Sequence, residues 1–415
     1  MNAPRIHNIA EKGKPGWIPG RMTLVLVFGL LIGAALWPVL TVGAQAQVVG
    51  AIKHSATQPA FLERLDNDDQ FGNAVATLGD LDGNGVDDIA VGAWHDGFGG
   101  LYYGAVWILF LGQDGTVEYR QMIGSRRGGF DVALDTADVF GYSLAGLGDI
   151  DGDGVPDLAV GSPTDDDGGT GRGAVYILFL RSDGTVKSYQ KISDTQGGFG
   201  GVLHDDNWFG YSVASIPDLD GNTVDDLVVG AGWDNDGGTK TGAVWVLFLD
   251  ATGTVINQQK ISPLEGGLTA VLDDNDYFGS SVTTVGDIDG DLVPDIVVGA
   301  ENDDDGVQDA GAVYVLFMND NGTVKAEQKI SNGTGQLPGG TLSVVDAFGC
   351  SVAALGDYDG DGVEDIVVGA HSWSGPGGYG GIWVLFLNDD GTVKTYQEIT
   401  QGVGGLGNVL EQTDH

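Results

Sequence analysis

The segment Asp149-Ile-Asp151-Gly-Asp153-Gly-Val155-Pro-Asp157 is one of five related acidic loops in this chain of 415 residues. Each copy follows a Phe-Gly pair, and the pairs begin at positions 71, 140, 209, 278 and 348. A chain of this length normally holds two or three domains, but copies at a nearly constant spacing of 69 or 70 residues indicate one repeat array.

The second repeat shows what each unit builds. Short apolar or alternating stretches at 140–148, 158–161, 173–180 and 185–192 predict four strands, with Asp183-Gly184 as a hairpin turn. The third stretch is apolar on both faces and therefore requires burial on both sides. Four antiparallel strands packed between neighbours are typical of a β-propeller blade. We therefore expect an all-β propeller over 71–415 with five visible blades of about 69 residues, complete or part of a six- or seven-bladed ring.

The fourth strand of each blade is expected at the outer edge, where lysine commonly protects against pairing with other chains. The sequence supports this placement, because half of the basic residues after position 46 fall on these strands: Arg120, Lys187, Lys191, Lys260, Lys325, Lys329 and Lys394.

Oxygen-bearing side chains alternate along each acidic loop, as in loops that wrap around one Ca²⁺ ion. Positions 1, 3, 5 and 9 carry Asp or Asn, and position 7 is valine, which can offer only its backbone carbonyl. The candidate ligands are Asp80, Asp82, Asn84, Val86 and Asp88; Asp149, Asp151, Asp153, Val155 and Asp157; Asp218, Asp220, Asn222, Val224 and Asp226; Asp287, Asp289, Asp291, Val293 and Asp295; and Asp357, Asp359, Asp361, Val363 and Asp365.

We expect about one Ca²⁺ per repeat and up to five in all. An EF-hand is excluded, because position 12 is valine in every copy and the flanking segments are strands. A metal-free acidic turn is the alternative for a single loop. Position 6 is glycine in three copies but Thr223 and Leu292 in the others, so a positive φ there would strain those two loops.

The N-terminal segment differs from the repeats. Residues 1–46 have a basic start, an apolar stretch and Ala44-Gln-Ala46, which predicts a cleaved signal peptide; an uncleaved membrane anchor is the alternative. Residues 47–70 then form a lead-in. Both alternatives predict a secreted or cell-surface protein. The net charge of −41 argues against nucleic-acid partners, and the single cysteine, Cys350, excludes an internal disulfide.

The order Phe-Gly, Gly-Asp-x-Asp-Gly-Asx-Gly-x-x-Asp, Val-Gly-Ala and Gly-Ala-Val-Tyr/Trp resembles the FG-GAP repeat of integrin alpha-subunit propellers and their bacterial relatives. The resemblance covers about 71–400 and implies a calcium-binding propeller whose ligands bind the face opposite the acidic loops. The chain departs from that pattern in having five repeats, and only Pro163 keeps the proline that follows Gly-Ala. Residues 404–415 repeat the linker before a blade, which favours a fragment of a larger ring over closure by this tail.

The residues point to binding rather than catalysis. The six histidines share no repeat position, and no nucleophile–base set stands out. We therefore expect a calcium-dependent module that binds an extracellular protein or glycan; the alternatives are a spacer, a non-catalytic propeller attached to a hydrolase, and a polysaccharide-cleaving enzyme. Further acidic clusters at 165–167, 234–236 and 303–305 are interpreted as solvated loops, with a second cation or ligand surface as the alternative.

Overall fold

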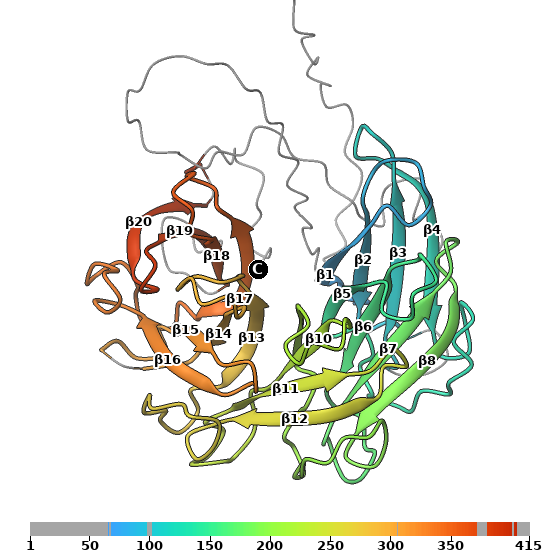
Figure 1. Cartoon of the computed structure of the whole chain (residues 1–415), viewed down its shortest axis with the longest axis horizontal. Coiled ribbons are helices and arrows are strands. Elements are labelled where there is room, and N and C mark those ends of the chain that lie inside the picture. Colours follow the sequence, from blue (N-terminus) through green and yellow to red (C-terminus); the bar gives the residue numbers. More distant parts are fainter. Residues whose placement is uncertain are drawn as a thin grey trace, which may run out of the picture.

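The computed structural model describes residues 65, 68–97, 102–304, 306–371, 380–400 and 402–404. Within this part, twenty strands form five four-stranded antiparallel sheets that follow one another around a common axis as the blades of a propeller (Figure 1). The predicted signal peptide lies outside the described residues. No helix in the described part is long and apolar enough to cross a membrane.

Each blade takes four consecutive strands, with the first innermost and the fourth outermost. Blade 1 contains β1 (Phe71–Gly79), β2 (Asp88–Ala93), β3 (Ala105–Leu111) and β4 (Val117–Gly124); blade 2 contains β5 (Leu144–Gly148), β6 (Asp157–Ser162), β7 (Ala174–Leu180) and β8 (Val186–Ser193); blade 3 contains β9 (Ser212–Ile216), β10 (Asp226–Ala231), β11 (Ala243–Leu249) and β12 (Val255–Ile261); blade 4 contains β13 (Phe278–Thr284), β14 (Ile296–Ala300), β15 (Ala312–Met318) and β16 (Val324–Ile330); blade 5 contains β17 (Phe348–Gly356), β18 (Asp365–Ala370), β19 (Gly381–Leu387) and β20 (Val393–Ile399).

The third strands have apolar side chains on both faces, because blades 2, 3 and 4 have a neighbouring blade on each side. Every residue of β3, β7, β11 and β15 is buried. Their side chains alternate between separate apolar cores, which lie between blades 1 and 2, 2 and 3, 3 and 4, and 4 and 5. The all-β propeller predicted from the sequence is thus confirmed.

Glycine is required where consecutive blades meet. A Cβ added to Gly161 would lie 2.1 Å from the carbonyl oxygen of Gly210 in the next blade, and Gly92, Gly230 and Gly299 are in the same position. Parallel bridges join Gly104 to Phe140, Gly173 to Phe209, Gly242 to Phe278, and Gly311 to Phe348. The Phe-Gly pair of one blade is therefore a docking element for the blade before it.

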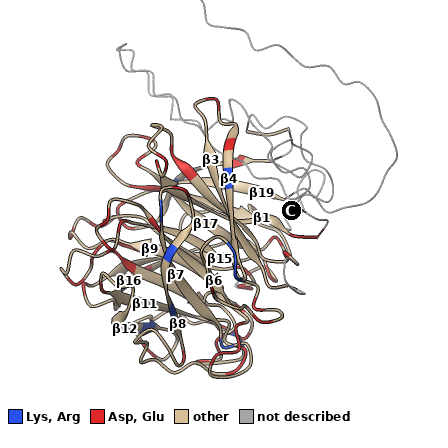
Figure 2. Cartoon of the chain, turned by 90° about the vertical axis from the view of Figure 1, so that its right-hand side faces the viewer, with Lys and Arg blue, Asp and Glu red and all other residues tan. Residues whose placement is uncertain are grey.

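The strand directions send the two acidic regions of a blade to opposite ends. The repeated acidic loops join the first strand to the second, as predicted, and the later clusters lie between the second and third strands. Most acidic residues lie in loops, whereas basic residues lie mainly on strands (Figure 2). Negative charge is therefore concentrated at the two ends of the propeller, where the loops lie.

Candidate metal centres

Each acidic loop is folded around the aspartate at its first position. In the second loop, Asp149 accepts hydrogen bonds from the backbone amides of Asp153, at 3.0 Å, and Gly154, at 2.7 Å. Asp153 in turn accepts one from Val155 at 3.0 Å. The other four loops repeat the pattern. The backbone amides thus fix the position of the first carboxylate.

The aspartate at position 9 connects the loop to the interior of the blade. Asp157 is fully buried, and its two oxygens accept hydrogen bonds from the amides of Ile150, at 3.2 Å, and Leu180, at 3.0 Å. Burial raises the pKa of Asp157 to about 7. Asp88, Asp226, Asp295 and Asp365 make the same two contacts. This carboxylate therefore holds the end of the third strand as well as facing the loop.

Three carboxylates converge in every loop, with one oxygen from each within 4.8 Å of the others. The groups are Asp80, Asp82 and Asp88; Asp149, Asp151 and Asp157; Asp218, Asp220 and Asp226; Asp287, Asp289 and Asp291; and Asp357, Asp359 and Asp361. Positions 1 and 3 converge in all five, joined by position 9 in three loops and by position 5 in two. Such an all-oxygen set fits Ca²⁺, and Asp151 Oδ1 is a buried oxygen without a hydrogen-bond partner.

Position 6 adopts a positive φ in all five loops, which is the condition under which the sequence predicts strain at Thr223 and Leu292. φ is 84° at Gly85, 87° at Gly154 and 94° at Gly362, and it is 75° at both Thr223 and Leu292. Side chains in this region of φ are strained by contact between Cβ and the backbone. The third and fourth loops therefore contain a strain that the others lack.

Lysines from the fourth strands lie on three of the loops, a contact that the sequence analysis missed. Lys187 Nζ is 2.6 Å from Asp151 Oδ2 and also contacts Asp153. Lys325 likewise contacts Asp289, at 2.6 Å, and Asp291; Lys394 lies 2.6 Å from both Asp359 and Asp361. The signal was available, because the three loops with a lysine are those with aspartate at position 5.

The interpretation of the second acidic clusters as solvated loops is wrong for their first aspartates. Asp165, Asp234 and Asp303 are only 4%, 1% and 2% exposed. Each is paired with a fourth-strand lysine: Lys191 at 2.9 Å, Lys260 at 3.1 Å and Lys329 at 2.6 Å. Burial of the carboxylates is tolerated because the chain itself supplies a cation.

Aromatic side chains gather at the end of the propeller opposite the acidic loops. Trp208 and Trp233 stack at 3.8 Å between ring centroids, and Tyr142 and Tyr211 lie 4.8 Å apart. Lys240 lies 3.4 Å above the ring of Trp233. Further contacts join Trp94 to Tyr142, Trp208 to Tyr211 and Trp233 to Tyr277. These partly exposed rings form a continuous surface across blades 1, 2 and 3.

Glu301 occupies the repeat position of Pro163, and blade 4 is the only blade with a carboxyl group at that position. Limited contact with water raises the pKa of Glu301 to about 7. Burial raises the pKa of Tyr142, Tyr211 and Cys350, and the charge of Glu301 adds to each of these shifts. Among the described residues, its electrostatic neighbours are therefore phenols and a thiol. Glycoside hydrolysis generally uses a pair of carboxyl groups. Glu301 thus gives no support to the enzymatic alternative.

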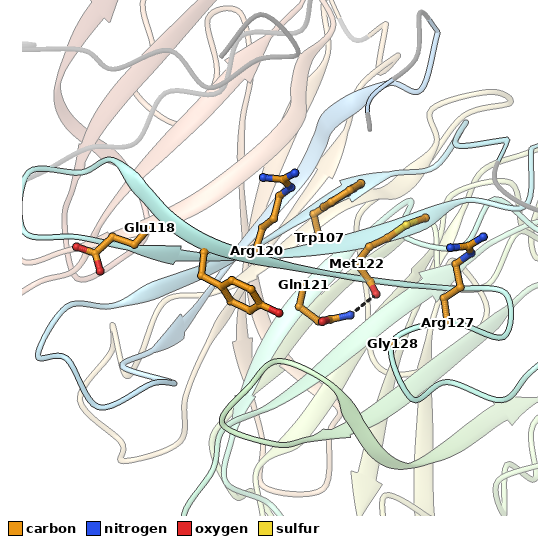
Figure 3. Close-up of a pocket in the computed structure, with 8 residues that line it drawn as sticks. Trp107, Glu118, Arg120, Gln121, Met122, Arg127 and Gly128 are labelled. Atoms are coloured by element: carbon orange, nitrogen blue, oxygen red, sulfur yellow. Dashed lines mark hydrogen bonds between the residues drawn. The ribbon is translucent and has the colours of Figure 1, made fainter. Parts of the chain in front are cut away.

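A cavity of about 490 Å³ lies on the outer part of blade 1 (Figure 3). It is lined by Trp107, Arg120 and Met122, among others. In the next two blades, the counterparts of Trp107 pack against linker side chains: Phe130 lies 5.5 Å from Tyr176, and Phe199 lies 5.0 Å from Trp245. The cavity therefore lies where a linker phenylalanine packs against the third strand in blades 2 and 3.

The repeats match known protein-family models. Models described as "FG-GAP repeat" match residues 140–178, 209–247, 268–317 and 348–385. FG-GAP repeats therefore occur in four of the five blades. The FG-GAP matches include four of the five Phe-Gly pairs and their acidic loops.

Integrin alpha chains are among the proteins to which this chain is similar. Integrin alpha-PS2 of Drosophila melanogaster is 37% identical over 166 residues, which are 39% of this chain and 11% of the relative. Integrin alpha-6 of Gallus gallus is 38% identical over 39% of this chain and 13% of its own length. Integrin alpha pat-2 of Caenorhabditis briggsae is 31% identical over 56% of this chain and 18% of its own length. The chain thus matches less than a fifth of each of these relatives.

Proposed function

We propose that the chain is an extracytoplasmic binding module whose FG-GAP propeller is stabilised by Ca²⁺. The observation that carries the proposal is the convergence of three carboxylates in each of five loops. Bound Ca²⁺ would offset the repulsion between these carboxylates and join the ends of the first and second strands. Asp80, Asp149, Asp218, Asp287 and Asp357 would be the ligands that the backbone positions best.

The partner is proposed to be an extracellular protein or glycan that binds at the opposite end of the propeller. Similarity to integrin alpha chains supports an adhesive role. The aromatic surface around Trp208 and Trp233 supplies partly exposed ring edges, beside the ammonium of Lys240, against which a partner can pack. Calcium would act indirectly, since the acidic loops lie at the other end of the strands. Its role would be to keep the blades rigid.

Thermal denaturation in Ca²⁺ and in EDTA tests the proposal. We expect Ca²⁺ to raise the Tm of the full chain, because a ligand that binds only the folded state stabilises it. The double variant Asp218→Asn/Asp220→Asn should lose part of that increase, so that its Tm differs less between Ca²⁺ and EDTA than the Tm of the unmodified chain does. The control Asp320→Asn/Asp389→Asn makes the same charge change at exposed turn residues and should behave as the unmodified chain. Equal Tm values of the unmodified chain in Ca²⁺ and EDTA would contradict the calcium role.

A further inference from the structure

The residue at loop position 5 varies together with one residue of the fourth strand. Asp153, Asp291 and Asp361 occur in the blades that carry Lys187, Lys325 and Lys394. The two blades with Asn84 and Asn222 carry Glu118 and Ile256 at the corresponding strand position. All five blades obey this relation, although the two positions are more than thirty residues apart in sequence.

The asparagine loops show why the lysine is dispensable there. Asn84 Nδ2 donates a hydrogen bond to the carbonyl of Leu111 at 3.0 Å, and Asn222 Nδ2 donates one to Leu249 at 2.8 Å. An ionised aspartate has no hydrogen to donate, so at this position it needs a different cationic or donor partner. The lysine ammonium supplies that partner in the other three blades.

The lysines contact the same carboxylates that would bind calcium. Lys187 contacts Asp151, and Lys394 contacts Asp359 and Asp361. These three aspartates belong to the groups of converging carboxylates. The lysine loops have four carboxylates at positions 1, 3, 5 and 9, whereas the asparagine loops have three. One ammonium therefore brings the charge summed over these four positions and the lysine to the same value of three negative charges.

We propose that Lys187, Lys325 and Lys394 are built-in counter-cations that divide the five loops into two calcium classes. This inference rests on the proposed calcium role. The asparagine loops, 80–88 and 218–226, bind Ca²⁺ without competition. In the lysine loops the ammonium must give up two ion pairs or remain close to the divalent ion, so they bind Ca²⁺ more weakly by about fivefold. The lysine loops also keep a charge partner when calcium is removed.

Calorimetric titration of the full chain with CaCl₂ tests the two classes. We expect two tighter and three weaker sites in the unmodified chain. The triple variant Lys187→Met/Lys325→Met/Lys394→Met should bind Ca²⁺ about fivefold more tightly at the three weaker sites. Lys187→Met is compared with Lys240→Met, which removes one positive charge at the opposite end and should change calcium affinity less.

A transfer experiment guards against misfolding of the triple variant. Asn222→Asp alone adds a carboxylate to the third loop and should tighten its calcium binding. Asn222→Asp/Ile256→Lys recreates the lysine pair there and should bind about fivefold more weakly than Asn222→Asp. Calcium affinities that do not respond to any of these lysine changes overturn the inference but leave the calcium role intact. No calcium binding by the unmodified chain or by any variant overturns both.

Discussion

The two acidic regions of blade 3 contain the same residue type in opposite surroundings. In the loop 218–226, Asp218 and Asp220 converge with Asp226 and have backbone amides as partners. At the other end of the blade, Asp234 is buried beside Lys260, which also lies 3.2 Å from Asp236. An acidic cluster is thus the clearer candidate ion site where the chain supplies no buried cation of its own; in loops 149–157, 287–295 and 357–365 a partly exposed lysine lies on the carboxylates instead. The residue types of the two acidic clusters alone do not tell a candidate metal site from a cluster paired with a lysine.

Removing the buried cation should have the largest effect. Lys260→Met leaves Asp234 buried without its partner and should lower the free energy of unfolding by about 3 to 5 kcal/mol. Urea denaturation in EDTA and in Ca²⁺ should show the same loss in both. Lys187→Met is the matched comparison: its ion pairs are partly exposed, so the loss should stay below about 1 kcal/mol. Equal losses for the two variants would remove the distinction between the regions.

Within the metal loop, position 9 should matter more to the apo protein than position 3. Asp226→Ala leaves the buried amides of Leu219 and Leu249 without their 2.9 Å acceptors, and we expect a loss of about 2 to 3 kcal/mol in EDTA. The loss in Ca²⁺ should be larger, because a proposed ligand is removed as well. Asp220→Ala should lose stability mainly in Ca²⁺. Chemical denaturation under both conditions measures the difference, and a smaller loss for Asp226→Ala than for Asp220→Ala in EDTA would refute it.

A buried carboxyl near the second region should make stability depend on pH. Burial raises the pKa of Asp138 from 3.8 to about 7, so between these values the folded chain keeps a proton that the unfolded chain has lost. The free energy of unfolding therefore falls as pH rises from about 4 to 7. Asp138→Asn should remove this part of the slope and be more stable above pH 7 by on the order of 2 kcal/mol.

The repeat itself supplies the precedent for that substitution. Asn207 occupies the corresponding place in blade 3 and accepts the His204 amide at 2.6 Å, as Asp138 accepts the Asp135 amide at 2.7 Å. Stability curves measured from pH 4 to 8 for Asp138→Asn and the unmodified chain should therefore diverge toward high pH. Curves that remain parallel would show that Asp138 does not titrate in this range.

The sequence predicted the propeller because the same pattern of strands, turns and loops occurs in each of the five repeats. Apolar third strands, Asp-Gly turns and the acidic loops all agree on one blade. The role of Lys187 was missed because strand position alone suggested edge protection, and the contact joins residues 34 apart. The burial of Asp165 was missed because it follows from how Lys191 and Tyr176 approach in three dimensions. Local patterns carry no such information.

The smallest expected effect concerns the strain at position 6. Leu292 has φ of 75° and is 90% exposed, so its side chain gains little packing there. Leu292→Gly should relieve the strain, although glycine adds freedom to the unfolded chain, and we expect a net gain of about 0.5 to 1 kcal/mol. Gly154→Leu is the reverse change in a loop where no atom lies within 4 Å of an added Cβ, so its cost would be conformational alone. If denaturation in EDTA shows no effect of opposite sign for the two variants, position 6 does not distinguish the loops, and the lysine pairs remain the main difference among them.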